Sequence, residues 1–536
     1  MEIGTLCLVL VAPLPYWALG LPWLSSDRLR VAPLLGCALA GLYAEWAMIA
    51  ALPVRTTVAL ALVVSCAVAI YRRHELGGAS RALLEWLPFY WVSVLAASIS
   101  PFPVLGSWSG DWLVLYQMGE AVAAGDLPKN MLTRPPLFGA STVPLWLLQP
   151  GLIPYQLMAA VASASAITTT FRFVRHLRAN ARLILLVPLV ISPFFLHHTA
   201  AAWGKFLAGG LVVAALIEAL RRQQLPAALL FALAVAVHEG FVIWAPCLLL
   251  CQVHGRSWRS ALKGLLLMAG AGVFIVSPYV LWVIAKYGLG AKIAASPVLN
   301  GVIPLPWWQR TGLGILASFI GWGPIQVMVR WCSNPDAGSL KVIVKESYWL
   351  ATSWITTLAS TMVGFLLPFL IAIPSLRASP RRAALSWPGV WTNVGIGIAV
   401  FLNSALAAFY SNEGTMQNAL LPLALIVYAY LVTELGSLED RASAALRQVT
   451  WLSIATGTAP WLILNAGISA ALWLSAGVRQ RFALGSEGDY FRVVDNHLHP
   501  LGLAVFPAVP CLCVVLLVGW FSLPTWRIGG RWSVSG

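Results

Sequence analysis

Runs of about 20 consecutive apolar residues recur from one end of this chain to the other, and each is long enough to cross a bilayer as a helix. A helix satisfies its own backbone N–H and C=O groups, which find no water in the membrane interior. The runs therefore predict an all-α polytopic membrane protein.

The composition points to the same class and to a single domain. Of the 536 residues, 59% are hydrophobic and 10% are charged, whereas soluble domains carry about 25% charged residues. No polar stretch is long enough to form a separate soluble domain. Residues 1–536 are thus expected to form one bundle of roughly 13–15 transmembrane helices, with interfacial helices in the outer loops.

The expected spans are 3–24, 31–52, 56–71, 82–102, 152–172, 183–200, 206–220, 225–253, 265–287, 350–374, 389–410, 419–436, 452–478 and 500–521. The run 225–253 is too long for one straight span and is expected to break at His238 into two short helices.

The net charge of +15 is distributed between the spans and not in one stripe or tail. Short basic clusters alternate with the apolar runs, as the positive-inside rule predicts for cytoplasmic loops. This pattern argues against nucleic acid as a partner and favours membrane lipids. The clusters are Arg28/Arg30, Arg72/Arg73/Arg81, Arg172/Arg175/Arg178/Arg182, Arg221/Arg222, Arg256/Arg259/Lys263, Arg377/Arg381/Arg382, Arg441/Arg447 and Arg527/Arg531.

The long loops 103–151, 288–349 and 479–499 then fall on the extracytoplasmic side of what we expect to be a bacterial plasma membrane. Loops on one face of a rigid scaffold are where function is usually found. Any chemistry is therefore expected on the outer side.

The first of these loops contains the most informative acidic residues. Asp111 closely follows a span, and residues 112–124 fit a helix lying along the interface, which the Gly125–Pro128 break ends. Asp111 and Glu120 are nine residues apart, or about 13 Å along a helix axis, which argues against a paired-carboxylate glycosidase site. An aspartate at this position could also serve as a helix N-cap.

This loop resembles the first outer loop of the GT-C superfamily of membrane glycosyltransferases, especially protein O-mannosyltransferases and lipid A aminoarabinose transferases. The resemblance rests on Asp111 after a span, the amphipathic helix, the Gly125–Asp126 turn and Arg134 before Pro-Pro-Leu. It implies a GT-C-like helical bundle that uses a polyprenyl-phosphate sugar as its donor. It also implies that Asp111 is the catalytic base or orients the acceptor. The next outer loop carries Lys205 where the family often has a second acid.

A lipid-phosphate donor requires cations near the membrane surface, and Lys205 and Arg134 are the candidates. Lys205 begins an apolar run, where a charge is costly unless it is used, although a lysine there could also snorkel to the interface. Further candidates for binding donor phosphate or substrate are His198, His238, Glu239 and Glu120. A metal is the rival interpretation of the histidines, but no HExxH-like spacing occurs, and no metal site or other cofactor is expected.

Together these features predict transfer of a sugar from a polyprenyl-phosphate carrier to an extracytoplasmic glycan, lipid or protein acceptor. The first alternative is a lipid or sugar transporter or flippase, which would place charges such as Glu45 and Glu85 near the bilayer midplane. A polysaccharide polymerase or ligase is the second, because the later outer loops contain several arginines.

Overall fold

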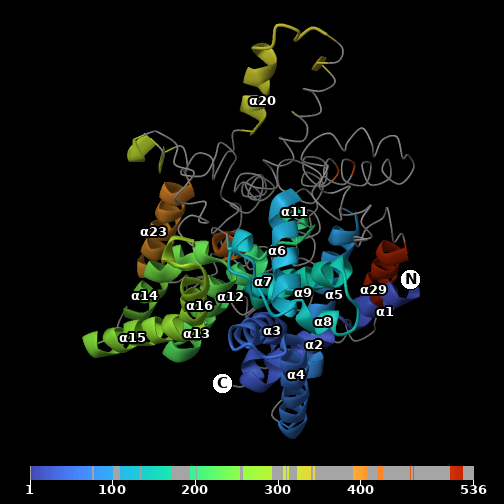
Figure 1. The fold of residues 1–536 in the computed structure, drawn as a ribbon, viewed down its shortest axis with the longest axis vertical. Helices are drawn as coiled ribbons and strands as arrows, with labels where there is room; N and C mark the ends of the chain where they lie inside the picture. Colours follow the sequence, from blue (N-terminus) through green and yellow to red (C-terminus); the bar gives the residue numbers. More distant parts are fainter. Residues whose placement is uncertain are drawn as a thin grey trace, which may run out of the picture.

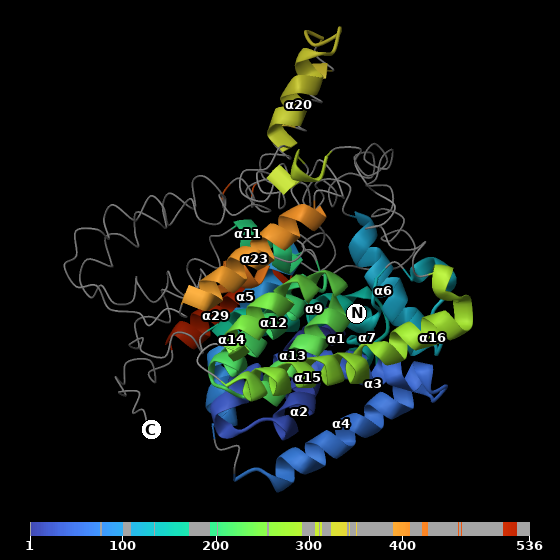
Figure 2. The same cartoon turned by 90° about the vertical axis from the view of Figure 1, so that its left-hand side faces the viewer.

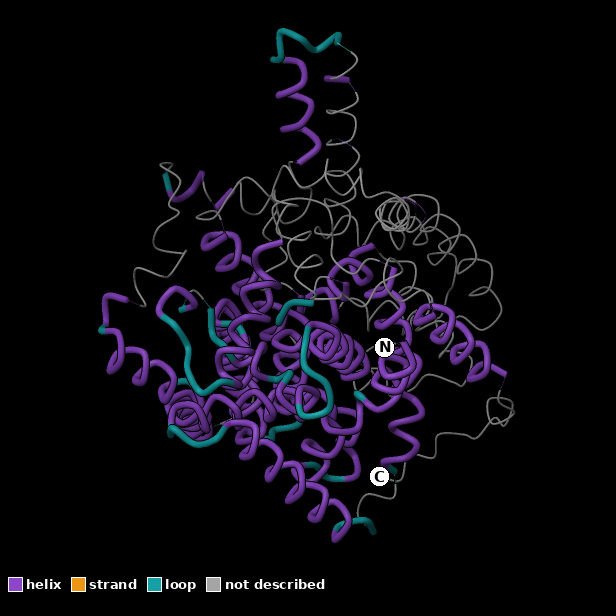
Figure 3. Tube along the Cα trace, turned by 45° about the vertical axis from the view of Figure 1, so that its right-hand side comes forward, coloured by secondary structure: helices purple, strands orange, loops and turns teal. Residues whose placement is uncertain are grey.

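The structure is a computed structural model. It describes residues 2–74, 78–99, 109–132, 134–170, 193–200, 202–253, 257–291, 323–339, 390–407, 421–426 and 508–522, with a few shorter pieces between 306 and 463. Every regular element in these segments is a helix, and none of them contains a strand (Figure 3). The predicted all-α class is therefore confirmed for the part of the chain that the structure describes.

Six helical segments among the described residues are long and apolar enough to cross a membrane. They are Ile3–Trp23, Arg28–Ile49, α4 (Val54–Tyr71), α5 (Ala79–Ile99), α9 (Leu152–Thr170) and α15 (Trp258–Ile275). Each lies close to an expected span, and together they support a multi-pass membrane protein. The expected spans 350–374 and 452–478 fall almost wholly outside the described residues, so the total of 13–15 stays a prediction.

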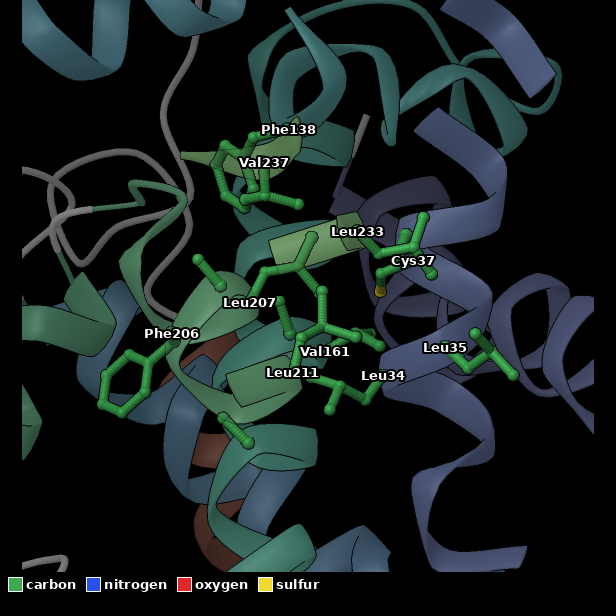
Figure 4. Close-up of a cluster of buried hydrophobic side chains, with 14 of the residues drawn as sticks. Leu34, Leu35, Cys37, Phe138, Val161, Phe206, Leu207, Leu211, Leu233 and Val237 are labelled. Atoms are coloured by element: carbon green, nitrogen blue, oxygen red, sulfur yellow. The ribbon is translucent and has the colours of Figure 1, made fainter. Parts of the chain in front are cut away.

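Helix α9 lies at the centre of the bundle, and every one of its residues is buried. It packs against α5 and against α12 (Lys205–Leu220), which in turn packs against α13 (Gln224–Val237). Figure 4 shows the apolar side chains that fill this interior. They include Leu34, Phe138, Val161, Leu207, Leu211, Leu233 and Val237.

Helices at the edge of the bundle expose large apolar side chains. Leu60 and Val63 of α4 and Leu266 and Phe274 of α15 are each more than half exposed. Figure 2 shows both helices on the outside of the bundle. A soluble monomer rarely exposes so much contiguous apolar surface, whereas a bilayer covers it with acyl chains.

Several expected spans are divided where proline or glycine interrupts the helix. The first consists of α1 (Glu2–Val11), α2 (Pro13–Gly20) and the 3₁₀ helix η1 (Leu21–Trp23). Pro13 opens α2, because proline is tolerated in a first turn but not inside a helix.

The run 225–253 breaks at His238, as the sequence predicted. Helix α13 ends at Val237, the 3₁₀ helix η4 covers Glu239–Trp244, and α14 follows over Ala245–Val253. The expected span 265–287 also divides, into α15 and α16 (Ser277–Tyr287), with Pro278 in the first turn of the second helix. Because α15 begins at Trp258, Arg259 and Lys263 lie within a helix, and their assignment to a loop was wrong.

The C-terminal part of the chain returns to the start of the bundle. Helix α29 (Ala508–Ser522) packs against α5 and α1, and α23 (Val390–Ala407) packs against α14. Figure 1 shows α29 beside α1, although hundreds of residues separate them along the chain. Helix α20 (Gly323–Cys332), by contrast, projects away from the bundle.

Basic residues from four separate segments meet at one end of the bundle, the arginine-rich end. Arg28 and Arg221 lie 3.1 and 3.9 Å from the buried carboxylate of Glu218. Arg30 and Arg81 lie 2.6 and 3.2 Å from Glu85. Two further contacts join this end: Arg72 donates to the carbonyl of Pro22, and Gln224 donates to that of Ser260. These basic segments therefore lie at one end of the protein, as the sequence predicted.

Part of the first long loop lies deeper in the protein than the sequence predicted. It contains α6 (Ser109–Ala123), the 3₁₀ turn η3 (Lys129–Met131), α7 (Leu137–Ala140) and α8 (Val143–Trp146). All eight residues of α7 and α8 are buried. The extended outer loop expected over 103–151 is therefore corrected for its second half, since this apolar stretch packs into the bundle and not along its surface.

Candidate functional site

A cluster of histidines with Lys205 lies at the opposite end of the bundle from the arginines, and we call it the histidine end. Lys205 begins α12 and Glu218 lies near the end of it, so about 20 Å of helix separates them. Gln224 and His238 stand at the two ends of α13 in the same way. Two neighbouring helices therefore run from the arginine-rich end to the histidine end.

Lys205 is the central cation of this end. Its side chain is 2% exposed, and its Nζ lies 3.5 Å from the centroid of the Trp203 ring. A cation held over an indole face is stabilised electrostatically, and more strongly when it is shielded from water. A snorkelling lysine would extend its ammonium group into solvent, so this burial argues against that interpretation.

The turn that presents Lys205 is held in an unusual conformation. Ala202 adopts a positive φ of 47°, which is uncommon for a residue with a side chain. The hydroxyl of Tyr155, from the central helix α9, donates a 2.6 Å hydrogen bond to the carbonyl of Ala202. The bundle core therefore fixes the backbone three residues before Lys205.

His197 and His198 lie in the last turn of α11 (Pro193–Ala200) and are almost fully buried. Their rings are 6.0 Å apart and nearly perpendicular, and His198 also lies 5.4 Å from the Trp203 ring. Lys205 is close enough to act electrostatically on both imidazoles. The pair thus lies in a helix inside the protein, near the end of the expected span 183–200.

His238 occupies the break between α13 and η4, with extended backbone angles. The positive charges of Arg134 and Lys205 both act electrostatically on its imidazole. Cations from two distant parts of the sequence therefore lie around one ring.

Arg134 reaches this region from the first long loop, where α16 supports it. The hydroxyl of Tyr279 in α16 donates to the carbonyl of Arg134 at 3.5 Å. The carboxylates of Glu45 and Glu239 both act electrostatically on the same hydroxyl. The histidine end thus combines cations, carboxylates and imidazoles.

Close packing at Gly204 joins these segments. A Cβ added to Gly204 would lie 3.2 Å from the side chain of Phe138 and 3.3 Å from that of Val237. Phe138 belongs to the first long loop, and Val237 precedes His238. Figure 4 shows these two side chains next to each other. The three segments that carry Arg134, Lys205 and His238 therefore converge, as their candidate roles require.

Of the two acidic candidates in the first loop, Glu120 has a described side chain and Asp111 has only a described backbone. The backbone of Asp111 lies in the first turn of α6, which begins at Ser109, so Asp111 is not the residue that precedes the helix. The Asp111 side chain lies outside the described residues, and its role as a base stays a prediction. Glu120 is exposed, and its carboxylate accepts a hydrogen bond from Tyr116 at 2.5 Å.

Helix α16 also fastens the turn that ends α6. Lys286 forms an ion pair with Asp126, and the Tyr287 hydroxyl donates to the carbonyl of Leu127 at 2.5 Å. Gly125, with a φ of 89°, makes the turn itself possible. Tyr279, Lys286 and Tyr287 were not among the site residues predicted from the sequence. The only available signal was their position in an apolar helix that leads into the second long loop.

Among the described residues, no three His, Cys, Asp or Glu side chains are grouped closely enough to hold a metal ion. The arrangement can bind an anion between the buried Lys205 and the partly buried Arg134 and donate hydrogen bonds to it. Comparisons with known proteins add nothing to this description: no protein-family model, curated protein or solved structure matches the chain.

Proposed function

We propose that this protein is a membrane glycosyltransferase of the GT-C type. It transfers a sugar from an undecaprenyl- or decaprenyl-phosphate carrier to a hydroxyl of a glycan, lipid or protein acceptor on the outer side of the membrane. The convergence of Arg134, Lys205 and His238 from three separate segments carries this proposal. A buried Lys205 and a partly buried Arg134 inside an apolar bundle mark a site for an anion, and a lipid-linked phosphate is the anion that the membrane itself supplies.

In the proposed reaction, the acceptor oxygen attacks the anomeric carbon of the sugar. The bond between that carbon and the phosphate oxygen breaks, and the polyprenyl phosphate leaves with the bonding electrons. Asp111 takes the proton of the acceptor hydroxyl, which is the role of a positioned general base. Lys205 and Arg134 stabilise the negative charge that grows on the departing phosphate.

Two observations favour this function over a transporter. Glu85, a candidate midplane charge, is tied to Arg30 and Arg81 at the arginine-rich end. Glu45, the other candidate, lies near the last turn of α3 (Ala32–Ile49) and acts on Tyr279 at the histidine end. Both carboxylates thus interact with residues near an end of the bundle, whereas alternating access would require a charge near the midplane. The arginines on which a polymerase or ligase would depend lie mainly outside the described residues.

The proposal is tested by Asp111→Asn in the full-length protein. Purified protein is incubated with a set of undecaprenyl-phosphate sugars and with acceptors prepared from cell envelopes, and transfer is measured with radiolabelled sugar. The amide keeps the size of the side chain but cannot accept the proton, so transfer should fall by about 10²–10⁴-fold. Binding of undecaprenyl phosphate and the melting temperature should stay unchanged.

Asp126→Asn provides the matched control, because it alters an exposed aspartate of the same loop. It should retain most of the transfer. If Asp111→Asn keeps full activity, the mechanism is wrong. If the wild-type protein transfers no sugar from any donor of the set, the assigned reaction is wrong.

A further inference from the structure

The two ring nitrogens of His238 have different environments, which fix the position of its proton. The backbone N–H of Gly240 donates to Nδ1 at 3.2 Å. A backbone N–H can only donate, so Nδ1 must accept and cannot carry a proton. The neutral ring therefore holds its proton on Nε2, and the cation, which needs protons on both nitrogens, would lose this hydrogen bond.

The Nε2 atom is buried, and no acceptor for it is present among the described residues. A buried donor without an acceptor destabilises the folded protein, and native structures contain few of them. The cations Arg134 and Lys205 act on the same ring. The N–H of Nε2 thus points to a ligand that is itself negatively charged.

We propose that His238 is a fixed hydrogen-bond donor whose Nε2–H binds a phosphate oxygen of the ligand. Its identification with the donor's phosphate rests on the proposed function. His238 does not act as a base, because one ring nitrogen is occupied by Gly240 and the other already carries the proton. It is a ligand-binding residue and leaves proton removal to a carboxylate.

The close approach of Gly240 makes this arrangement possible. A Cβ at position 240 would lie 3.1 Å from Cε1 and 3.2 Å from Nδ1 of His238, closer than such contacts normally are. A glycine at this position allows the amide to reach Nδ1 without displacing the ring. The break between α13 and η4 therefore holds the ring in a defined orientation.

A purely structural role for His238 would use Nδ1 alone, as the cap of η4. Two substitutions separate the two nitrogens. In His238→Asn, the side-chain oxygen takes the place of Nδ1 and keeps the cap, since asparagine is a good N-cap residue, but nothing reaches the position of Nε2. In His238→Gln, the amide nitrogen reaches that position, and the acceptor at Nδ1 is lost.

Binding is measured with the full-length protein in detergent, with undecaprenyl phosphate and inorganic phosphate as separate probes. His238→Asn should keep the wild-type melting temperature and bind undecaprenyl phosphate about ten- to a hundredfold more weakly, the effect of one charge-assisted hydrogen bond. His238→Gln should melt earlier but retain more of the binding. His74→Asn, at an exposed position, should change neither. Weak binding of inorganic phosphate with the same ranking would show that the headgroup alone is recognised.

Nitrogen NMR of histidine-labelled wild-type protein tests the tautomer directly. The signal that disappears in His238→Asn should be that of a neutral ring protonated on Nε2. A signal from the other tautomer, or equal binding by wild type and His238→Asn, would overturn the proposal. Neither measurement depends on sugar transfer. If phosphate binding depends on His238 but no sugar is transferred, the glycosyltransferase assignment fails while the phosphate site stands.

Discussion

At the scale of single residues, Lys205 shows how the site differs from an ordinary membrane surface. An ammonium group is strongly destabilised in an apolar interior unless other groups compensate for its lost hydration. Lys205 is nevertheless 2% exposed and lies over the Trp203 ring, with imidazoles nearby. A bound anion would stabilise this ammonium group further.

Substitution of Lys205 by methionine should separate ligand binding from stability. Loss of a charge-assisted hydrogen bond, worth about 1.5–3 kcal/mol, should weaken binding of undecaprenyl phosphate by one to two decades in titration calorimetry. The melting temperature should hold or rise, because the cost of burying a charge is removed. Lys205→Arg should keep part of the binding.

Lys129→Met is the control for Lys205→Met, because Lys129 is exposed in the first long loop. It should leave the affinity unchanged. Equal affinity of the wild-type protein and Lys205→Met would mean that this ammonium group does not bind phosphate. A large fall in melting temperature would instead indicate that Lys205 stabilises the fold through its protein contacts.

At the scale of elements, α6 is held in place by a close backbone contact with α7. A Cβ on Gly139 would lie 2.0 Å from the carbonyl oxygen of Leu115 and 2.8 Å from the amide nitrogen of Gly119. Only glycine at position 139 permits this distance. Because α6 carries Asp111 in its first turn, the contact also fixes the position of the Asp111 backbone.

Gly139→Ala should therefore destabilise the protein by at least about 1–3 kcal/mol, the usual cost of overpacking, and should lower transfer more than phosphate binding. Thermal melting and the two assays measure these effects. Gly270→Ala, in α15, meets no atom within 4 Å and should leave the melting temperature unchanged or slightly raised. Equal stability of the two variants would show that α6 does not depend on this contact.

The ion pair between Lys286 and Asp126 connects α16 to the turn after α6, and its contribution should depend on pH. The hydrogen bond from Lys286 lowers the pKa of the Asp126 carboxyl below the ordinary 3.8. A lowered carboxyl pKa stabilises the folded state above the unfolded-state pKa, and this stabilisation is lost as the pH falls through the folded-state value. Both side chains are well exposed, at 38% and 64%, so water screens the pair.

Lys286→Met should accordingly destabilise the protein by no more than about 1 kcal/mol at neutral pH. The difference from wild type, measured by denaturant unfolding, should stay constant down to roughly pH 5 and shrink below about pH 4 as Asp126 takes up its proton. Asp126→Asn should show the same profile, and the double variant should add little. A difference that grows in acid would contradict the assigned pair.

At the scale of the whole molecule, two chemically different ends define the protein. One gathers arginines in ion pairs with Glu85 and Glu218, and the other gathers buried histidines around Lys205. Helices α12 and α13 connect them across about 20 Å, enough for most of a hydrocarbon core. The positive-inside rule predicts that the arginine-rich end faces the cytoplasm and that the histidine end therefore faces the outer side.

Cysteine labelling in intact cells tests this orientation. In a background whose exposed native cysteines are replaced by serine, Asn130→Cys should react with a membrane-impermeant maleimide, and Ser257→Cys should react only after permeabilisation. Both positions are exposed in the structure, so access depends on the side of the membrane. The reverse pattern would place α6 and Asp111 in the cytoplasm and would contradict an extracytoplasmic reaction. The background substitutions are Cys7, Cys66, Cys332 and Cys511 to serine.

Much of the fold follows from the sequence, because span length and helix breaks are local properties. Apolar runs of the required length predicted α3, α4, α5 and α9 to within a few residues. The break at His238 was also predicted, since the run around it is too long for one span. The burial of α7 and α8 was not predicted. An apolar stretch too short to cross the membrane can lie along the membrane surface or inside a bundle, and its sequence does not distinguish the two positions.

The candidate residues of the site were also named from the sequence, since Lys205, Arg134 and His238 are polar groups beside apolar runs. Their convergence was decided by tertiary packing. Gly204 allows Phe138 and Val237 to meet around it, and the Tyr279 hydroxyl supports the backbone of Arg134. The proton position on His238 likewise depends on one amide two residues away. Periodicity and charge describe each helix separately, whereas these contacts exist only once helices distant in sequence have packed together.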